Sequence, residues 1–489
     1  MNDTAVTRIF GEVMSKVGTR ILVAGAGVSG RSAAEALLAE GASVTVTDAS
    51  EERLAELAGP RMRGAELVVG LTEPPSATDL VVTSPGWRPD APLLTAAEAA
   101  GIEVISEIEL AWRLDRASAR PAHWLAVTGT NGKTTTVGML ESVLRAAGMD
   151  AVACGNVGLP AVDAVRAGHR VLAVELSSFQ LHWSNTFSPD TGVILNLAED
   201  HLDWHGSLRA YGAAKGKVYG GNSVSVYNAD DPASRELVTE HSAARRVGIT
   251  LGEPEPGQLG VRDEELLDRA FGPDGVSTSA EAAPVSLATV ADVRQVGEHN
   301  LANALAACAL ARSCGVSATA CAEGLREFAP GKHRSVVVAR SGGIVYVDDS
   351  KATNPHAASA ALGAHRDVVW IAGGLLKGAE VDELVRQHAH RLRAAVLIGT
   401  DQESIAEALR RHAPDVPVVG IPTRREAAMS EAVRSANDYA TSGTAVVLAP
   451  AAASMDMYTD YAHRGREFAA AVRAVRAEPG TEPAEHPRG

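Results

Sequence analysis

Residues 19–50 read TRILVAGAGVSGRSAAEALLAEGASVTVTDAS, and this stretch decides the fold class. The apolar run RILVAG leads into the glycine-rich sequence GAGVSG, residues 25–30, and an Ala/Leu-rich amphipathic segment follows. SVTVTD then forms a second strand-like run that ends at Asp48. This order of strand, turn, helix and strand predicts a parallel α/β unit whose glycine turn and helix N-terminus can accept an anion, while the acid can hold a ribose.

The same alternation continues outward from this unit in three blocks, which predicts an α/β protein built on parallel sheets covered by helices. The segment at about 250–290 is rich in glycine, proline and acidic residues, so we expect loops and short antiparallel strands there. The three blocks contain these strand-like runs: 20–25, 43–48, 66–70, 80–84 and 103–106; 124–129, 171–177, 191–197 and 223–228; 343–349, 367–374, 394–400, 416–421 and 444–450. A linking helix is expected around 108–116 and two more helices over 299–315 and 317–328, and the tail 479–489 is expected to be disordered.

Composition excludes several classes of protein. The 489-residue chain carries a formal net charge of -15, which argues against a nucleic-acid partner, because phosphate neutralisation needs a basic surface. No apolar stretch is long enough to cross a bilayer, and the first twenty residues lack the basic and apolar regions of a secretory signal, which predicts a cytoplasmic protein. The four cysteines (Cys154, Cys308, Cys314 and Cys321) form no CxxC pair and predict reduced core residues.

A second glycine loop stands at residues 126–140, AVTGTNGKTTTVGML, again between a strand and a helix. The generic phosphate-loop pattern requires glycine at position 127, where this chain has valine, so the match is partial. Gly129 and Gly132 can nevertheless free the backbone to cradle phosphates, Lys133 can reach the β and γ oxygens, and Thr134 can ligate Mg²⁺.

Carboxylates and an imidazole follow two further strands of the second block. Glu175 ends the run VLAVE, and Asp200, His201 and Asp203 follow the run TGVILNL. The carboxyl ends of parallel strands share one edge of a sheet, so we expect these groups beside the 129–134 loop. Such side chains suit Mg²⁺, which bridges nucleotide phosphates.

In the third block, polar groups follow three strands. Lys351 and Thr353 lie in DDSKATN, Lys377 in GGLLKG, and Ser454 in APAAASMDMY. Two lysines and a serine at one sheet edge predict a site for a small carboxylate.

The glycine turn at 25–30 leaves several ligands open when taken alone. It is compatible with NAD(P), with another nucleotide or diphosphate, or with no ligand. A second phosphate loop in another block disfavours a dehydrogenase, since hydride transfer does not use ATP. A nucleotide sensor without catalysis is a third possibility.

The motifs together resemble the Mur ligase family over nearly the whole chain, from about Val23 to about Phe468. The resemblance is closest to the members that add D-glutamate, and DDSKATN is the most discriminating motif. Sister ligases for other amino acids and folylpolyglutamate synthase carry different sequences at that turn and remain the alternatives. The motifs, in chain order, are TGTNGKTTT, ELSSFQL, NLAEDHLD, YGAAKGKVY, HNLANALAA, HRSVVV, DDSKATNPHA, GGLLKG and APAAASMDMY.

The resemblance implies a three-domain fold and an ATP-dependent amide ligase. Its domains would be an N-terminal Rossmann-like domain for the UDP-linked substrate (1–108), a central ATPase domain (109–330) and a C-terminal Rossmann-like domain for the amino acid (331–478). The partners implied are UDP-N-acetylmuramoyl-L-alanine, D-glutamate and ATP, with Mg²⁺, expected to be two ions, as cofactor. We expect a monomer that neither binds nucleic acid nor enters a membrane.

The resemblance also implies roles for individual residues. Lys133 would contact the γ-phosphate, Thr134 and Glu175 would hold one Mg²⁺, and Glu175, His201 and Lys215 would serve a second. Lys215, in YGAAKGKVY, would act as a carbamate formed with CO₂. The implied ATP-binding residues are Gly129, Thr130, Asn131, Gly132, Lys133, Thr134, Thr135, Asn300, Asn303, His333, Arg334 and Asp349. The implied substrate-binding residues are Val28, Ser29, Asp48, Asn156, Lys351, Thr353, Lys377, Ser454 and Tyr461.

Three departures from the family pattern concern the amino-acid site. Leu375 and Leu376 stand where many relatives have polar residues, Ala449 replaces a frequent serine, and Tyr461 replaces a phenylalanine. They affect the expected contacts to D-glutamate and leave the reaction unchanged.

Overall fold

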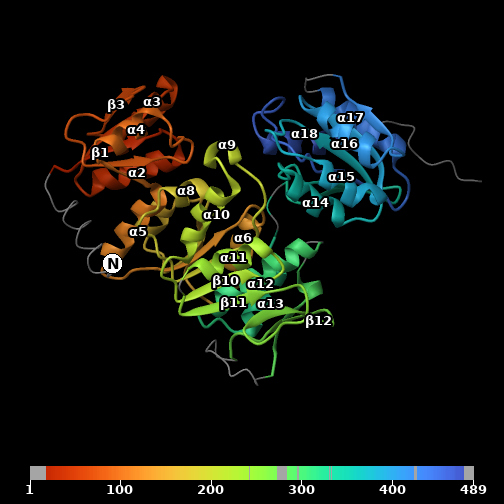
Figure 1. Cartoon of the computed structure of the whole chain (residues 1–489), viewed down its shortest axis with the longest axis horizontal. Helices are drawn as coiled ribbons and strands as arrows, with labels where there is room; N and C mark the ends of the chain where they lie inside the picture. Colours follow the sequence, from red (N-terminus) through yellow and green to blue (C-terminus); the bar gives the residue numbers. More distant parts are fainter. Residues whose placement is uncertain are drawn as a thin grey trace, which may run out of the picture. The chain divides into compact units, whose positions relative to one another are not determined.

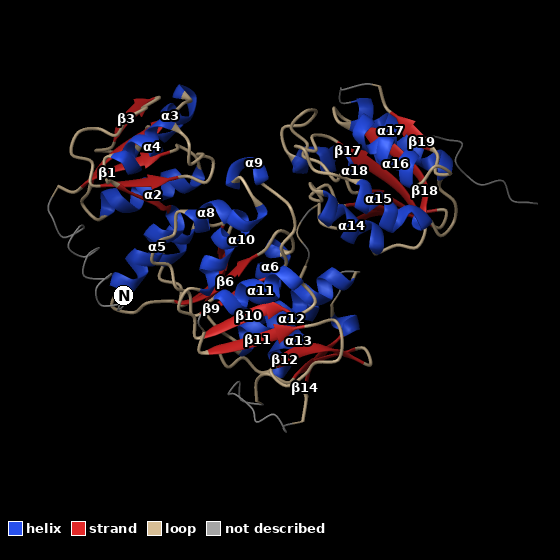
Figure 2. Ribbon diagram, viewed as in Figure 1, coloured by secondary structure: helices blue, strands red, loops and turns tan. Residues whose placement is uncertain are grey.

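The computed structural model describes residues 18–241, 243–272, 283–293, 297–329, 331, 333–422 and 427–477. The expected disorder of 479–489 lies outside these residues. The chain forms two compact units, residues 1–293 with 302–328 and residues 294–301 with 329–489. The two units contain three β-sheets that are flanked by helices, as Figure 1 and Figure 2 show. The α/β class and the three-domain architecture are confirmed, whereas the exact domain limits remain predictions.

The first sheet is parallel throughout, with strand order β3-β2-β1-β4-β5. The chain order reverses between β1 and β4, and such a reversal leaves a crevice at the carboxyl ends where ligands bind. The elements are β1 (Arg20–Ala24), α2 (Val28–Ala39), β2 (Ser43–Asp48), α3 (Glu51–Leu57), β3 (Glu66–Val69), β4 (Leu80–Thr83), α4 (Pro92–Ala99) and β5 (Glu103–Ser106). All five predicted strands are present.

The glycine turn that opens α2 is required by close packing. A Cβ added to Gly30 would lie 1.8 Å from the carbonyl oxygen of Gly25, so only glycine lets the first turn of α2 approach the end of β1. Gly25 itself has φ +112°, a backbone region that glycine enters without steric cost. The sequence GAGVSG therefore has the structural role that its spacing predicts.

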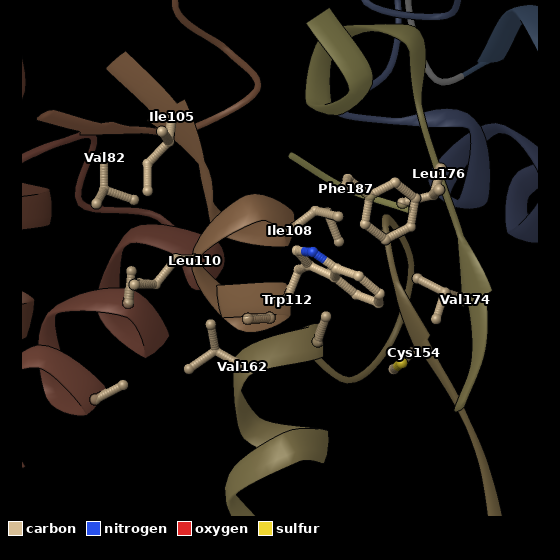
Figure 3. Close-up of a cluster of buried hydrophobic side chains, with 14 of the residues drawn as sticks. Val82, Ile105, Ile108, Leu110, Trp112, Cys154, Val162, Val174, Leu176 and Phe187 are labelled. Atoms are coloured by element: carbon tan, nitrogen blue, oxygen red, sulfur yellow. The ribbon is translucent and has the colours of Figure 1, made fainter. Parts of the chain in front are cut away.

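Helix α5 (Glu107–Ala117) joins the first and second blocks into one unit. The carboxylate of Glu109, on this helix, is buried and accepts backbone N–H groups of Asn185, Thr186 and Phe187 at 3.0–3.1 Å. The rings of Trp112, Trp124 and Phe187 meet edge to face at 5.5–5.8 Å. Figure 3 shows Trp112 in the hydrophobic cluster that includes Phe187. Each aromatic pair contributes about 0.5–1.5 kcal/mol beyond area burial. The same buried cluster includes strand residues of the first and of the second sheet, so the two blocks share one core.

The second sheet has strand order β14-β13-β12-β11-β10-β9-β6-β8-β7. It is parallel from β7 to β12, and β12, β13 and β14 pair antiparallel, as expected for the 250–290 segment. Its strands are β6 (His123–Thr128), β7 (Ala151–Gly155), β8 (Val171–Glu175), β9 (Thr191–Ile194), β10 (Val224–Asn228), β11 (Arg245–Ile249), β12 (Gln258–Arg262), β13 (Glu265–Asp268) and β14 (Val285–Thr289). Its helices are α6 (Lys133–Ala146), α7 (Ala161–Arg166), α8 (Ser178–His182), α9 (Leu202–His205), α10 (Leu208–Gly216), α11 (Pro232–Glu240), α12 (Glu298–Arg312) and α13 (Ala318–Glu327).

Two strands of the second sheet, β7 and β11, were not among the predicted ones. The sequence AVACG of β7 is short and rich in small residues, and RRVGI of β11 begins with two arginines, so neither has the β-branched signature of a buried strand. Sheet pairing overrides these weak local preferences.

The third sheet has strand order β15-β16-β20-β17-β18-β19, with β15 antiparallel to β16. The elements are β15 (Val336–Ser341), β16 (Ile344–Asp348), α14 (Pro355–Gly363), β17 (Val368–Gly373), α15 (Asp382–His388), β18 (Leu392–Ile398), α16 (Gln402–His412), β19 (Val418–Gly420), α17 (Ala427–Tyr439), β20 (Ala445–Leu448) and α18 (Tyr461–Ala477). The five predicted strands and the helices between them are present, and β15 is an addition. Within the described part of the chain, no helix is long and apolar enough to span a membrane.

The four cysteines carry free thiols, as predicted. Cys154, Cys308 and Cys321 are buried in the core, while Cys314 is partly exposed.

Candidate active site

The phosphate loop lies at the carboxyl end of β6, a strand of the second sheet that is flanked by β9 and β8. Gly132 caps α6 in the left-handed conformation (φ +88°), and a Cβ there would lie 2.4 Å from Oδ1 of Asn303. The left-handed φ therefore favours glycine, and a Cβ would also displace the Asn303 side chain. Nζ of Lys133 donates to the carbonyl oxygens of Gly129 and Thr130, each at 2.9 Å. The lysine cation thus lies within the loop that is expected to hold phosphates.

Two residues that the sequence did not single out hold this loop in place. The side-chain oxygen of Asn196 accepts the N–H of Asn131 at 2.9 Å, and its amide donates back to the Asn131 carbonyl at 3.2 Å. The phenol of Tyr211 lies 3.2 Å from Oγ1 of Thr130. Asn196 follows β9 at the same edge, so the strand-end rule that found Glu175 could have found it as well, whereas Tyr211 lies on α10, where that rule does not apply.

A hydroxyl, a carboxylate and an amide meet beside the loop. Oγ1 of Thr134 donates to Oε2 of Glu175 at 2.6 Å, and Nδ2 of Asn156 donates to Oε1 of Glu175 at 3.0 Å. Glu175 is buried at the end of β8. The structure therefore brings two predicted site residues, Thr134 and Asn156, into contact with the carboxylate of a third, Glu175.

His201 reaches the same edge from the turn before α9. It has φ +54°, its N–H donates to Oδ1 of Asp200 at 2.9 Å, and its ring centroid lies 6.5 Å from that of Tyr211. Among the described residues, no three His, Cys, Asp or Glu side chains are grouped closely enough to hold a metal ion by themselves. A metal here would need the Thr134 hydroxyl or another oxygen ligand, so the predicted role of His201 remains a prediction.

Lys215 is a fully buried lysine on α10, with 1% of its surface exposed. Its Nζ donates to the Gly129 carbonyl at 2.8 Å and to Oγ1 of Thr128 at 3.3 Å, and it lies 4.6 Å from the ring centroid of Tyr211. Burial and, next in size, the positive charge of Lys133 lower the pKa of Lys215 well below its usual value. The amine is therefore held beneath the phosphate loop in a form that gives up its proton readily.

In the first sheet, the glycine turn and Asp48 form one structure. The carboxylate of Asp48 accepts the N–H groups of Ala26 at 2.8 Å and of Ser50 at 2.9 Å. Burial raises the pKa of Asp48, but backbone hydrogen bonds together with the positive charge of Arg53 lower it overall. An open pocket of about 610 Å³ lies beside Asp48 and is lined also by Ser50 and Arg53. Val28 and Ser29 start α2, and Val28 is 70% exposed there.

In the third sheet, a histidine–aspartate pair lies at the end of β16. Nδ1 of His333 lies 2.6 Å from Oδ2 of Asp348, and His333 has φ +63°. Burial raises the pKa of the neighbouring Asp349 to about 6, although hydrogen bonds from Ser335 and the charge of Arg334 act in the opposite direction.

The predicted amino-acid-binding residues follow neighbouring strands of the third sheet. Lys351 follows β16, and its Nζ lies 4.0 Å from the ring centroid of Tyr461, at the start of α18. Lys377 follows β17 and has φ +53°, while the buried Ser454 follows β20. Thr353 donates its N–H to the Lys351 carbonyl at 2.8 Å.

Arg464 is a further residue of this region that sequence reasoning missed. It is 1% exposed and donates to Ser350 (Oγ at 3.0 Å, carbonyl at 2.9 Å), to the Ala452 carbonyl at 3.1 Å and to the Gly373 carbonyl at 3.3 Å. One guanidinium therefore fastens the carboxyl ends of β16, β17 and β20. The sequence around Arg464 gives no indication of this burial, because an arginine in a polar helical segment is normally exposed.

Replacing Arg464 with methionine is expected to lower the free energy of unfolding by about 2–4 kcal/mol, because several buried carbonyl groups would lose their donor. Thermal unfolding measures the change. Arg466 lies exposed on the same helix, so R466M is the matched control and should leave the midpoint within about 1 °C. Equal midpoints for both variants would contradict this role of Arg464.

The predicted site residues fall into three groups, one at each sheet. The second sheet brings together the loop 129–135 with Asn156, Glu175, Lys215 and Asn303, and His201 follows β9 at the same edge of the sheet. The first sheet carries Val28, Ser29 and Asp48, and the third carries His333, Arg334, Asp349, Lys351, Thr353, Lys377, Ser454 and Tyr461. Asn300 is buried on the first turn of α12.

Three family models match the chain in order. They are the Mur ligase MurD-like N-terminal domain at residues 19–106, the Mur ligase middle domain at 127–311 and the Mur ligase glutamate ligase domain at 333–452.

Relatives of high identity span almost the full length. A protein of Thermobifida fusca named UDP-N-acetylmuramoylalanine–D-glutamate ligase is 54% identical over 94% of this chain and 99% of its own length. A protein of the same name from Streptomyces coelicolor is 51% identical with the same two coverages.

Solved structures share the fold at low identity. UDP-N-acetylmuramate-alanine ligase MurC from Thermotoga maritima superposes with a TM-score of 0.55 at 20% identity, over 93% of this chain and 99% of that chain. MurF from Acinetobacter baumannii superposes with a TM-score of 0.58 at 18% sequence identity, over 93% of each chain. The family models match all three sheets, and relatives at about 50% identity span nearly the full length. This chain therefore belongs to the Mur ligase family.

Proposed function

We propose that this chain is an ATP-dependent ligase that adds D-glutamate to UDP-N-acetylmuramoyl-L-alanine, with ADP and phosphate as the other products. The observation that carries the proposal is the 54% and 51% identity, over 94% of the chain, to ligases named for this reaction. The phosphate loop with Glu175 and Lys215 at one sheet edge supplies the chemistry that such a ligase needs. The reaction is a step in peptidoglycan precursor synthesis.

The chemical problem is that a carboxylate does not react with an amine, because oxide is a poor leaving group. Attack of the substrate carboxylate on the γ-phosphorus of ATP forms an acyl phosphate and releases ADP. The amino group of D-glutamate then attacks the acyl carbon, phosphate leaves, and the amine loses a proton to give the amide. Two anions meet in the first step, so positive charge at the γ-phosphate lowers the barrier. We assign this task to Lys133, whose Nζ lies at the phosphate loop.

The residues present fit a magnesium ion. Thr134 and Glu175 offer a hydroxyl and a carboxylate oxygen side by side, which are the hard oxygen ligands that Mg²⁺ prefers. We infer that these two residues would hold one Mg²⁺, and that Glu175, His201 and Lys215 would serve a second. The ion would neutralise phosphate charge during the transfer.

Lys215 serves this role if its amine is converted to a carbamate, as the resemblance implies. A lysine amine attacks CO₂ only in its neutral form, and burial together with Lys133 lowers the pKa of Lys215, which favours that form. The carbamate would place an anion next to Lys133, whose positive charge can balance it. This environment supports the carbamate proposal.

The other two sheets would hold the remaining substrates. The open start of α2 at Val28 and Ser29 would receive the diphosphate of the UDP-linked substrate, with the uridine near Asp48. D-glutamate would be bound by Lys351, Thr353, Lys377, Ser454 and Tyr461. Asn156 would lie near the muramoyl group of the UDP-linked substrate. The ATP site would be lined by Asn300, Asn303, His333, Arg334 and Asp349.

We propose that this enzyme is a monomer in the cytoplasm.

The test is phosphate release from ATP by the purified chain. Release should require UDP-N-acetylmuramoyl-L-alanine and D-glutamate together, and omission of either should reduce it to background. Equal turnover with L-glutamate, or turnover with a folate in place of the UDP-linked substrate, would overturn the proposal.

A further inference from the structure

Lys377 lies in a short turn whose backbone is held from outside. After β17 the chain runs Gly374, Leu375, Leu376 and Lys377, and Lys377 has φ +53°, which non-glycine residues rarely adopt. The N–H of Leu375 donates to the carbonyl of Ala453 at 2.9 Å, and the N–H of Ala453 donates back to the carbonyl of Leu375 at 2.9 Å. The turn is therefore bound on one side to the segment that carries Ser454.

On the other side, one carboxylate fixes the turn. The N–H of Leu376 donates to Oδ2 of Asp401 at 2.8 Å, and the N–H of Asp401 donates to the carbonyl of Gly374 at 3.1 Å. Asp401 stands at the carboxyl end of β18, the strand next to β17. It thus binds two successive peptide groups of the turn, the one between Gly374 and Leu375 and the one between Leu375 and Leu376.

Asp401 is itself held in place. Its loop, residues 399–401, is fixed by Asp456, whose Oδ2 accepts the N–H of Thr400 at 2.8 Å. Asp456 lies two residues after Ser454. The segments after β17, β18 and β20 are therefore joined by hydrogen bonds through two aspartates.

We infer that Asp401 is a positioning residue for D-glutamate binding, acting through the Leu376 N–H to fix the left-handed backbone from which Lys377 reaches the ligand. A misplaced Lys377 would weaken its ion pair with a ligand carboxylate, because such bonds depend on short, aligned contacts. The inference rests on the proposed function, since it assigns Asp401 to the amino-acid site of that reaction. Leu376, one of the departures from the family pattern, contributes its backbone N–H here, so its apolar side chain does not impair this contact.

The experiment compares D401A, D401N and E403A in steady-state kinetics. D401A removes the acceptor and is expected to raise KM for D-glutamate about 10-fold, while KM for ATP and for UDP-N-acetylmuramoyl-L-alanine stay within about 2-fold. D401N keeps an oxygen that can accept the Leu376 N–H and should stay within about 3-fold of the parent. Glu403 lies exposed on the adjacent helix α16, so E403A is the matched control and should behave as the parent.

A double-mutant cycle with Lys377→Ala separates positioning from a general structural effect. If Asp401 acts through Lys377, D401A in the K377A background should add less than about 2-fold to the loss in kcat/KM for D-glutamate. The inference would be overturned if the losses in kcat/KM of the two single variants multiplied in the double variant. It would also be overturned by an unchanged KM for D-glutamate in D401A, or by an equal rise of KM for all three substrates. The parent chain is assayed first: absence of D-glutamate-dependent turnover there refutes the proposed function, whereas failure confined to D401A refutes only the role of Asp401.

Discussion

Replacing Lys133 with alanine is expected to lower kcat about 1,000-fold, because the transferred phosphoryl group would lose the cation that stabilises its charge. Nζ of Lys133 lies within hydrogen-bonding distance of two carbonyl oxygens of the loop itself, so the cation is already at the place where phosphate would bind. Binding of the UDP-linked substrate should persist, since its diphosphate and uridine are assigned to the first sheet. Phosphate release under saturating substrates measures kcat, and calorimetric titration measures substrate binding.

The matched control for Lys133 is Arg145, a mostly exposed cation on the same helix that pairs with Glu141 at 2.8 Å. R145A removes one positive charge from α6 without touching the loop, and its kcat should stay within about 2-fold of the parent. Equal kcat values for K133A and the parent would refute the role of Lys133 at the γ-phosphate.

Replacing Lys215 with alanine is expected to lower kcat at least about 100-fold, since the metal site would lose an anionic ligand. Short carboxylates such as formate or acetate should restore part of the activity, because the deletion leaves a space beside Gly129 and Thr128 into which an oxygen anion can enter. Activity titrated against acetate concentration measures the rescue.

The control for Lys215 is Arg209, which lies exposed on the same helix α10. R209A should match the parent and show no response to acetate. Parent-like activity in K215A would refute the metal role, and loss of activity without rescue would refute the carbamate as its chemical form. Mass spectrometry of the intact native protein should show an added 44 Da, the mass of CO₂, on the parent and none on K215A.

The sequence predicted the fold where local pattern and tertiary packing agree. The runs that became β1, β6 and β17 are largely apolar with β-branched residues, and each is buried between two neighbouring strands of its sheet. The strands β7 and β11 were missed because they are short and rich in small residues or partly polar, and only pairing with a neighbour defines them. The strand β15 was missed although VVVARS begins with three valines, and it pairs with β16.

For the site, strand ends were the useful signal. The rule that ligands bind at the carboxyl ends of parallel strands placed Lys133 and Glu175 at one edge, and the structure puts Thr134 in hydrogen-bond contact with Glu175. The same rule could not decide the ligand of GAGVSG, because a glycine turn at a helix N-terminus binds any diphosphate. The dehydrogenase alternative was set aside by the second phosphate loop and by relatives at about 50% identity.

Residues that act through buried contacts were beyond the reach of sequence reasoning. Arg464 and Asp401 are charged residues in polar contexts, and nothing in the pattern distinguishes them from solvated side chains. Only the folded chain shows that Arg464 contacts three strand ends and that Asp401 receives the N–H of Leu376. The burial of Lys215 could not be predicted either, because its Ala-rich helix does not indicate that the lysine faces the phosphate loop.

The most direct test of the central claim follows an oxygen atom. UDP-N-acetylmuramoyl-L-alanine labelled with ¹⁸O in its alanine carboxylate is converted with ATP and D-glutamate, and the released phosphate is analysed by ³¹P NMR. An acyl-phosphate route transfers one carboxylate oxygen to phosphorus, so the phosphate should carry one ¹⁸O atom for each labelled molecule consumed. Unlabelled phosphate accompanying amide formation would contradict the account.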